Sequence, residues 1–286
     1  MRPLDISSAP AAIAEQIDGY LRTGSTSDSW RSVWPGDDFL ERARHAHEDL
    51  RGALIREVRR RAAGRSHESV PVGDTTELTR RKVTPMVRGL FPKSEQKEVL
   101  AVLERSVVFL TDSNIEQILY DQTWEGTAWN LANLYLLSLG AEAIADEAPR
   151  LVGLSEETTC FVSPGYFGNN GAFEDFVVHE AAHIFHNCKR ATVGLPETRT
   201  REWLLDIDFR KRETFAYSCE AYACILESAA SPTERRTLAD EFARDCSIPE
   251  ESVDATEVAS IIREAAAARN GWKVILARCA PSRRRQ

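Results

Sequence analysis

The chain has 286 residues, of which 43% are hydrophobic and 28% charged, and its formal net charge is −8. These values are ordinary for a globular protein of one large or two modest domains, and they exclude a disordered or fibrous chain. The acidic excess lies beyond residue 100, in the part that holds the candidate site described below, which argues against nucleic acid as a partner of that site.

The first residues lack the basic segment and long apolar run of a signal peptide, and no stretch reaches the roughly 18 apolar residues of a membrane span. We therefore expect a cytoplasmic protein without a membrane partner. The six cysteines are widely spaced and form no C-x-x-C pattern. In that compartment they are expected to be reduced and mostly buried.

The first third of the chain predicts helices. Residues 11–21 form a short amphipathic segment that Gly24 closes. Asp38, with Glu41 three residues later, predicts the start of a long helix that Gly64 ends. Residues 64–93 are rich in Gly, Pro, Ser, Thr and Arg, so we expect a linker or extended loop there, and a domain boundary.

Further helices and two strands are expected beyond this linker. The apolar segment 127–139 predicts a core helix. Residues 107–110 and 158–163 each predict a short buried strand, and a Gly- and Asn-rich turn follows the second strand. The remaining expected elements are helices over 94–105, from 113, over 211–228 and from Pro232, and a strand or short helix over 203–209.

The sequence His179-Glu180-Ala181-Ala182-His183 is the most informative stretch of the chain, and it lies in an apolar segment. Residues four apart lie on one face of a helix, so His179 and His183 can bind the same ion. Two imidazoles and a third protein ligand leave a fourth position on zinc open for water, the arrangement of a catalytic rather than a structural site. Glu180 is then placed to act as the general base.

The third ligand separates the classes of H-E-x-x-H protein. His186 is seven residues from His179, roughly 10 Å along a helix, which is too far for one zinc ion. We expect His186 to be a buried, hydrogen-bonded neighbour of the site. The metzincin pattern is excluded, because His186 replaces its glycine and Lys189 replaces its third histidine. The downstream acids remain, and we rank Glu213 first, then Glu220, then Glu202, and last Asp206 and Asp208.

The segment 212–220 favours Glu213. It resembles the third-ligand helix of the gluzincin metallopeptidases, in particular the N-E-G-F-A-x-Y-x-E pattern of zinc aminopeptidases. The matching residues are Glu213, Phe215, Ala216 and Glu220, whereas Arg212 and Thr214 differ and the tyrosine comes one position early. Glu202 has the family's spacing from His183, but residues 189–200 have the character of an insertion that would move the ligand to Glu213.

The resemblance covers residues 158–228 and implies a zincin-like catalytic domain that binds Zn²⁺ through His179, His183 and Glu213. Gluzincins commonly stabilise the oxyanion with a tyrosine or histidine beyond the ligands. Tyr166, Tyr217 and Tyr222 are the candidates here, and Tyr166 is chosen because it lies in the turn before the motif helix. A sheet edge near the metal often holds the peptide substrate in zinc peptidases.

We therefore expect an α+β, predominantly helical protein with a small sheet. Residues 1–93 would form an N-terminal helical region and linker, and residues 94–286 a zincin-like metallopeptidase domain. The expected activity is zinc-dependent cleavage of a peptide or protein substrate, with Glu180 as general base. The alternatives are a regulatory or binding protein that retains a zincin-like domain, with one substrate or none, and a tailoring enzyme that cleaves a small amide. The sequence does not indicate the oligomeric state.

Overall fold

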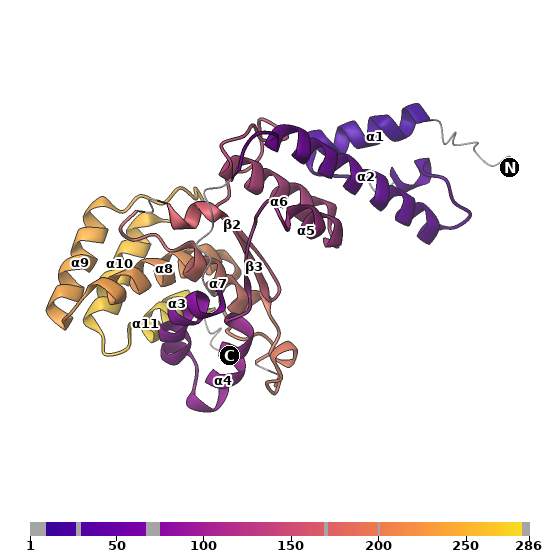
Figure 1. Cartoon of the computed structure of the whole chain (residues 1–286). Coiled ribbons are helices and arrows are strands. Elements are labelled where there is room, and N and C mark those ends of the chain that lie inside the picture. Colours follow the sequence, from indigo (N-terminus) through magenta and orange to yellow (C-terminus); the bar gives the residue numbers. More distant parts are fainter. Residues whose placement is uncertain (1–9, 27–29, 67–74, 169–170, 200, 282–286) are drawn as a thin grey trace. The chain divides into compact units, whose positions relative to one another are not determined.

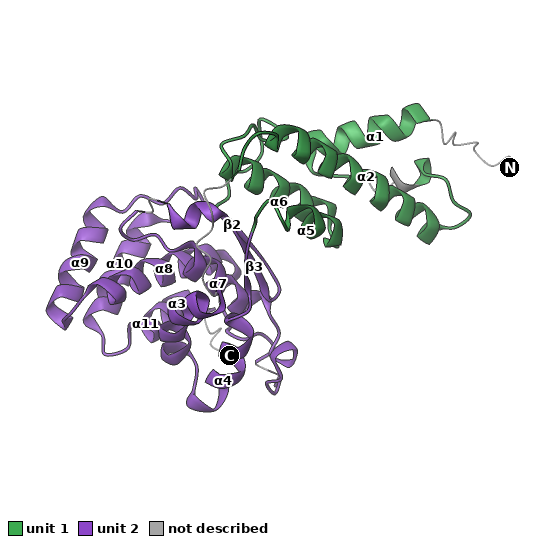
Figure 2. Ribbon diagram, viewed as in Figure 1, with its two compact units in different colours: residues 1–70, 110–152 green, residues 71–109, 153–286 purple. Residues whose placement is uncertain are grey.

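The computed structural model describes residues 10–26, 30–66, 75–168, 171–199 and 201–281. The fold is predominantly helical with one small three-stranded sheet, as expected for the α+β class. The chain divides into two compact units, shown in different colours in Figure 2. Unit 1 contains residues 1–70 and 110–152, and unit 2 contains residues 71–109 and 153–286.

Unit 1 is helical throughout its described residues. Its elements are α1 (Pro10–Thr23), the 3-10 helix η1 (Trp30–Val33), α2 (Phe39–Ala62), α5 (Ile115–Asp121) and α6 (Glu125–Ser138). The predicted cap of α2 is confirmed, because the Asp38 carboxylate accepts a hydrogen bond of 2.8 Å from the backbone N–H of Glu41. The buried guanidinium of Arg51 joins three segments by donating to the Tyr20 hydroxyl at 2.9 Å and to the Gln122 carbonyl at 3.1 Å.

Unit 2 is built around the sheet and the helix that carries the H-E-x-x-H motif. Its sheet has the order β1 (Val107–Phe109), β3 (Thr159–Val162), β2 (Gly153–Glu156). The central strand β3 is parallel to β1 and antiparallel to β2, with Val107 opposite Cys160 and Gly153 opposite Val162. The predicted strands correspond to β1 and β3, whereas the edge strand β2 was not predicted.

The helices of unit 2 surround the motif helix α7 (Phe176–Asn187), which contacts β2, β3, α3 and α8 (Figure 1). Buried Ala181 and Ala182 let neighbouring elements approach α7 closely, and Phe185 packs against Phe91 and Phe215. The other elements are the helices α3 (Thr75–Leu90), α4 (Lys93–Leu103), α8 (Arg212–Ser228), α9 (Pro232–Asp245), α10 (Ala255–Ala267) and α11 (Gly271–Cys279), with the 3-10 helices η2 (Pro164–Phe167), η3 (Ala191–Val193) and η4 (Phe209–Lys211).

The prediction of a linker over residues 64–93 is wrong for its second half. Residues 75–90 form α3, even though Pro85 lies inside the helix. Proline and glycine disfavour a helix, but burial of an apolar stripe overrides that preference here. The buried residues of the stripe are Val83, Met86, Val87 and Leu90. Residues 67–74 lie outside the described residues.

The units also differ from the predicted division at residue 93. Helix α3 and residues 91–109 belong to unit 2, and residues 110–152 belong with the N-terminal helices in unit 1. The reason is tertiary packing, since α5 and α6 contact α2. A boundary drawn from local composition cannot detect contacts between segments so far apart in the chain.

Residues 203–208 form neither a strand nor a helix, and Trp203 makes only an isolated bridge to Lys189 before η4 begins. Among the described residues, no helix combines the length and the apolar character that a membrane span requires.

Asp175 holds the start of α7 in place. Its carboxylate accepts hydrogen bonds from the Val178 N–H at 3.2 Å and the Tyr166 hydroxyl at 3.3 Å, and it pairs with Lys82 at 2.9 Å. The Asp175 side chain is only 3% exposed and that of Lys82 only 16%. Removal of this carboxylate therefore leaves the start of α7 without its cap, and it leaves Lys82 with Glu227, at 2.6 Å, as its remaining carboxylate partner.

We expect Asp175→Ala to lower the free energy of unfolding of unit 2 by about 3 kcal/mol or more, because it removes a cap and breaks a buried ion pair. Ser231→Ala is the matched control, since Ser231 caps α9 in the same unit at an exposed position. It should cost only about 1 kcal/mol. Urea denaturation of both variants measures the difference, and equal losses would contradict this role of Asp175.

Candidate metal centre

The motif helix brings its two predicted ligands together. Four residues separate His179 from His183, so both imidazoles lie on one face of α7. Their Nε2 atoms are 3.3 Å apart, and the ring of each is nearly buried. Both Nε2 atoms are thereby directed at the same point.

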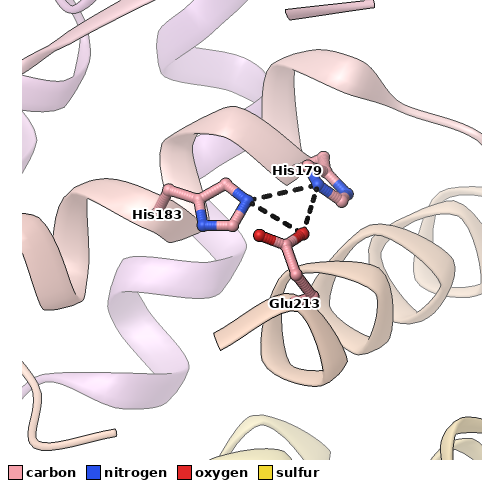
Figure 3. A group of neighbouring side chains, drawn as sticks. All are labelled: His179, His183 and Glu213. Atoms are coloured by element: carbon pink, nitrogen blue, oxygen red, sulfur yellow. Dashed lines mark hydrogen bonds and ion pairs between the residues drawn. The ribbon is translucent and has the colours of Figure 1, made fainter. Parts of the chain in front are cut away.

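Glu213 completes the group from α8, as Figure 3 shows. Its Oε2 lies 3.6 Å from Nε2 of His179 and 3.5 Å from Nε2 of His183. Zinc binds such atoms at about 2.0–2.2 Å, and two ligands at a tetrahedral angle are then about 3.3–3.6 Å apart. The three separations therefore fit one ion in a tetrahedral site, and among the described residues the group contains these three ligands, which leaves a fourth position open.

A carboxylate supports His179 from behind. Glu220 lies two turns after Glu213 on α8, and its Oε2 is 3.0 Å from Nδ1 of His179. Its other oxygen accepts a hydrogen bond of 2.7 Å from the Asp175 N–H. With the proton of the imidazole held on Nδ1, Nε2 is left free to bind a metal. Glu220 is thus an outer partner of the site rather than the third ligand.

His183 has an uncharged partner in the same position. Its Nδ1 is 3.0 Å from Nε2 of His186, and Nδ1 of His186 is 3.0 Å from Oδ1 of Asn187. With Nε2 of His183 left to the metal, each Nδ1–H donates to the next group along this chain. Burial, followed by the nearby charges of His183 and Arg212, lowers the pKa of His186 to about 3, in keeping with a neutral acceptor. The expectation that His186 is a hydrogen-bonded neighbour and not a ligand agrees with this geometry.

Glu180 lies on the side of α7 that faces the edge strand β2. Its side chain is so close to Gly153 that a Cβ atom there would be 2.6 Å from Oε1 of Glu180. The hydroxyl of Ser155 bonds to the Glu180 carboxylate and, at 3.0 Å, to the Glu180 carbonyl. Gly153 and Ser155 were not predicted, because four residues of mixed polarity give no clear strand signal.

The two tyrosines nearest the motif differ in their surroundings. The Tyr166 hydroxyl donates to Asp175, and its ring packs against Phe109 and Phe167. Tyr166 also lines a cavity of about 460 Å³ at the start of α7, together with Lys82 and Asp175. Its selection as the catalytic tyrosine is thus not favoured by the geometry, which gives it a place in the helix cap.

Tyr217 lies beside a predicted ligand instead. Its ring meets that of His179 edge to face, with the ring centroids 4.5 Å apart. Burial and then the carboxylates of Glu220 and Glu213 raise the pKa of Tyr217, so the phenol stays protonated at neutral pH. Tyr217 lies four residues after Glu213, so Glu213 and Tyr217 lie on one face of α8. This spacing is the sequence signal that distinguishes Tyr217 from Tyr166.

The other acidic residues that were considered as the third ligand have different surroundings. Glu202 pairs with Lys189 at 2.8 Å, and both side chains are about half exposed. The Asp208 carboxylate accepts a hydrogen bond from the Arg210 N–H and caps η4. Asp206 is exposed. Among the described residues, the grouping with the spacing of a metal site is His179, His183 and Glu213.

Comparisons of the chain with protein-family models, curated proteins and solved structures found no match.

In the absence of a metal, the neighbouring carboxylates favour the protonated form of His179. Burial opposes a charge on His179, but its hydrogen bonds to the carboxylates of Glu213 and Glu220 outweigh burial and raise the pKa of His179 to about 10. Although burial acts in the other direction, His179 and His183 hold the pKa of Glu213 well below its usual range. A metal ion must displace the proton of His179 to bind its Nε2.

For a metal bound by this group, we expect apparent affinity to rise with pH until His179 loses its proton at a pH of about 10. Because the raised pKa keeps the imidazole protonated near neutral pH, binding should release about one proton there. Titration calorimetry with Zn²⁺ in two buffers of different ionisation enthalpy measures that release. A zinc affinity that does not change with pH across the neutral range would contradict the raised pKa of His179.

The choice of third ligand has a direct test. Glu213→Ala should lower zinc affinity by at least a hundredfold, because two imidazoles alone bind zinc weakly. Glu202→Ala is the matched control: it removes an exposed carboxylate from the same unit and should leave affinity within about twofold. Competition with a chromophoric chelator measures both, and the opposite order would overturn the assignment of Glu213.

Proposed function

We propose that this protein is a zinc-dependent hydrolase that cleaves peptide bonds in a peptide or protein substrate. The observation that carries the proposal is the group of His179, His183 and Glu213, whose separations suit tetrahedral zinc. The proposal includes a zincin-like catalytic unit and a cytoplasmic location, as expected from the sequence. The proposed substrate is neither a nucleic acid nor a molecule held at a membrane.

The residues around the group supply the remaining parts of such a reaction. Zinc held there would polarise a water molecule and the carbonyl group of the substrate. Glu180 is adjacent to His179 in the chain and is buried, so it can accept the proton of the attacking water. Its carboxyl group can then return that proton to the departing amine, which leaves Glu180 ionised for the next cycle.

The edge strand β2 supports a peptide as the substrate. A strand at the edge of a sheet can pair through its backbone with an extended peptide. Ser155 of β2 contacts Glu180, so a peptide held along this strand would lie near the proposed base. A small amide would make little use of such an edge, and for this reason the peptidase is preferred to the tailoring enzyme.

The test compares the wild-type protein with Glu180→Gln. We expect both to bind one equivalent of zinc, measured by mass spectrometry of the metal. Only the wild type should cleave members of a broad peptide library, with Glu180→Gln slower by about 10²- to 10⁴-fold. Full activity in Glu180→Gln would disprove its role as base.

Two other outcomes bear on the alternatives. A wild-type protein that binds zinc but cleaves nothing in the library contradicts a general peptidase and favours the regulatory protein. Cleavage of small amides without cleavage of peptides favours the tailoring enzyme. A protein that takes up no zinc contradicts the metal site itself.

A further inference from the structure

The edge strand β2 holds the side chain of Glu180, the proposed base, through two contacts on one face. Gly153 and Ser155 are two residues apart on this strand, so both face the same side of the sheet. That side meets α7, because both residues lie against Glu180. The strand therefore determines where the Glu180 carboxylate can lie.

Ser155 binds one oxygen of that carboxylate. Its Oγ forms a hydrogen bond with Oε2 of Glu180 and lies 3.0 Å from the Glu180 carbonyl oxygen. An ionised carboxylate can only accept, so the Ser155 hydroxyl is the donor, and it has a single proton to give. Hydrogen bonds to a charged acceptor are among the stronger ones in proteins. This contact fixes the orientation of the carboxylate group.

Gly153 leaves room for the other oxygen. A Cβ atom at this position would lie 2.6 Å from Oε1 of Glu180 and 2.6 Å from its Cγ, so any larger residue would displace the Glu180 side chain. No described residue pairs with Oε1, and Oε1 is not among the sealed side-chain atoms that lack a partner, so solvent reaches it. The two oxygens are thus unequal: the strand holds Oε2, and Oε1 is open to water.

We propose that Ser155 is a positioning residue for the base and that Oε1 of Glu180 takes up the proton of the attacking water, an inference that rests on the proposed hydrolase. A lone pair of the water oxygen forms the new C–O bond, while one of its protons passes to Oε1 and the carbonyl pair moves to the carbonyl oxygen. When the C–N bond breaks, its electron pair stays on the nitrogen and takes the proton from Oε1, and the oxygen pair re-forms the carbonyl. Oε2 keeps its hydrogen bond to Ser155 in both steps.

The two contacts restrict a side chain that is otherwise free to adopt many conformations. Ordering a glutamate side chain costs conformational entropy, and a misplacement of about 1 Å in a reacting group can lower the rate by about 10²-fold. Strand β2 orders Glu180 before any substrate binds. Because β2 is also the edge strand proposed to pair with the peptide, one element would align both the substrate and the base.

The kinetic test compares Ser155→Ala with Ser155→Thr, which keeps the hydroxyl and suits a strand. On a peptide that the wild type cleaves, Ser155→Ala should lower kcat by about 10- to 100-fold, with KM within about threefold and zinc content unchanged. Ser155→Thr should keep most of the activity. Ser260→Ala is the matched control, because it removes another serine hydroxyl that bonds to a glutamate, on α10, and it should match the wild type. Equal losses in Ser155→Ala and Ser155→Thr would overturn the role of the hydroxyl.

A second variant tests the steric contact. Gly153→Ala adds a methyl group where the Glu180 side chain lies, so it should displace the carboxylate and lower kcat by about 10- to 100-fold, with zinc content unchanged. Gly19→Ala is the control, because a Cβ atom there meets nothing within 4 Å. Wild-type kcat in Gly153→Ala would show that the glycine is not required.

A third measurement needs neither zinc nor turnover. The urea denaturation of the metal-free protein is compared for the wild type, Ser155→Ala, Glu180→Ala and the double variant. Because the hydroxyl and the carboxylate are in contact, Ser155→Ala should lower the denaturation midpoint of the wild type but change that of Glu180→Ala much less. Equal shifts in the two backgrounds would contradict the contact.

The outcomes separate this inference from the proposed function. A zinc-loaded wild type that cleaves no peptide contradicts the proposed function and with it the catalytic role of Ser155, even where the denaturation data show the contact. A wild type that cleaves peptides no faster than Ser155→Ala contradicts only the role of Ser155. A fall in kcat that comes with a loss of zinc would show that the substitution disturbs the ligands, and it would overturn the inference as well.

Discussion

The carboxylate of Glu220 is the contact on which the arrangement of unit 2 depends. One of its oxygens accepts the Asp175 N–H at the start of α7, and the other lies 3.0 Å from Nδ1 of His179. A buried carboxylate is costly unless its oxygens are paired, so this residue fixes α7 and α8 against each other. Glu213 lies seven residues before Glu220, on the same face of α8. The contacts of Glu220 therefore also place the Glu213 carboxylate beside the two imidazoles.

The supports of the two histidines are unequal, and the difference bears on charge. His179 is backed by a carboxylate, whereas His183 is backed by the neutral side chains of His186 and Asn187. Two carboxylates, Glu213 and Glu220, would therefore neutralise the two charges of a divalent ion.

Local pattern was sufficient for much of the site. The four-residue spacing of the histidines and the helical context of Glu213 each follow from the geometry of a single helix, and the structure brings all three together. The same helix geometry places His186 too far from His179 for both to bind one ion. The sequence could not show that Gly153 and Ser155 lie on Glu180, because that contact joins segments 25 residues apart through a strand too short to recognise. Tyr166 is the tyrosine that the sequence favours, because it lies in a Gly- and Asn-rich turn before the motif helix. In the structure its hydroxyl donates to Asp175, the N-cap of α7.

The fold shows the same division between local and distant information. A continuous apolar stripe predicts a helix from sequence alone. Helix α3 does not follow from local composition, because its segment is rich in helix-breaking residues, including Pro85, and only burial of its apolar stripe stabilises it. The division into units was missed because it depends on which helices pack together. The sequence of unit 2 is interrupted after β1, at Phe109, and continues with β2, at Gly153.

That interruption governs how the protein can be taken apart. A single cut anywhere in the chain cannot release unit 2 intact, since its sequence is in two pieces. Truncation at residue 93 would strip α3 from its core and deprive α5 and α6 of α2. A free-standing unit 2 requires excision of residues 110–152 and a short splice from Phe109 to Gly153. The splice would end on the glycine against which Glu180 rests, so its length and sequence would have to leave β2 undisturbed.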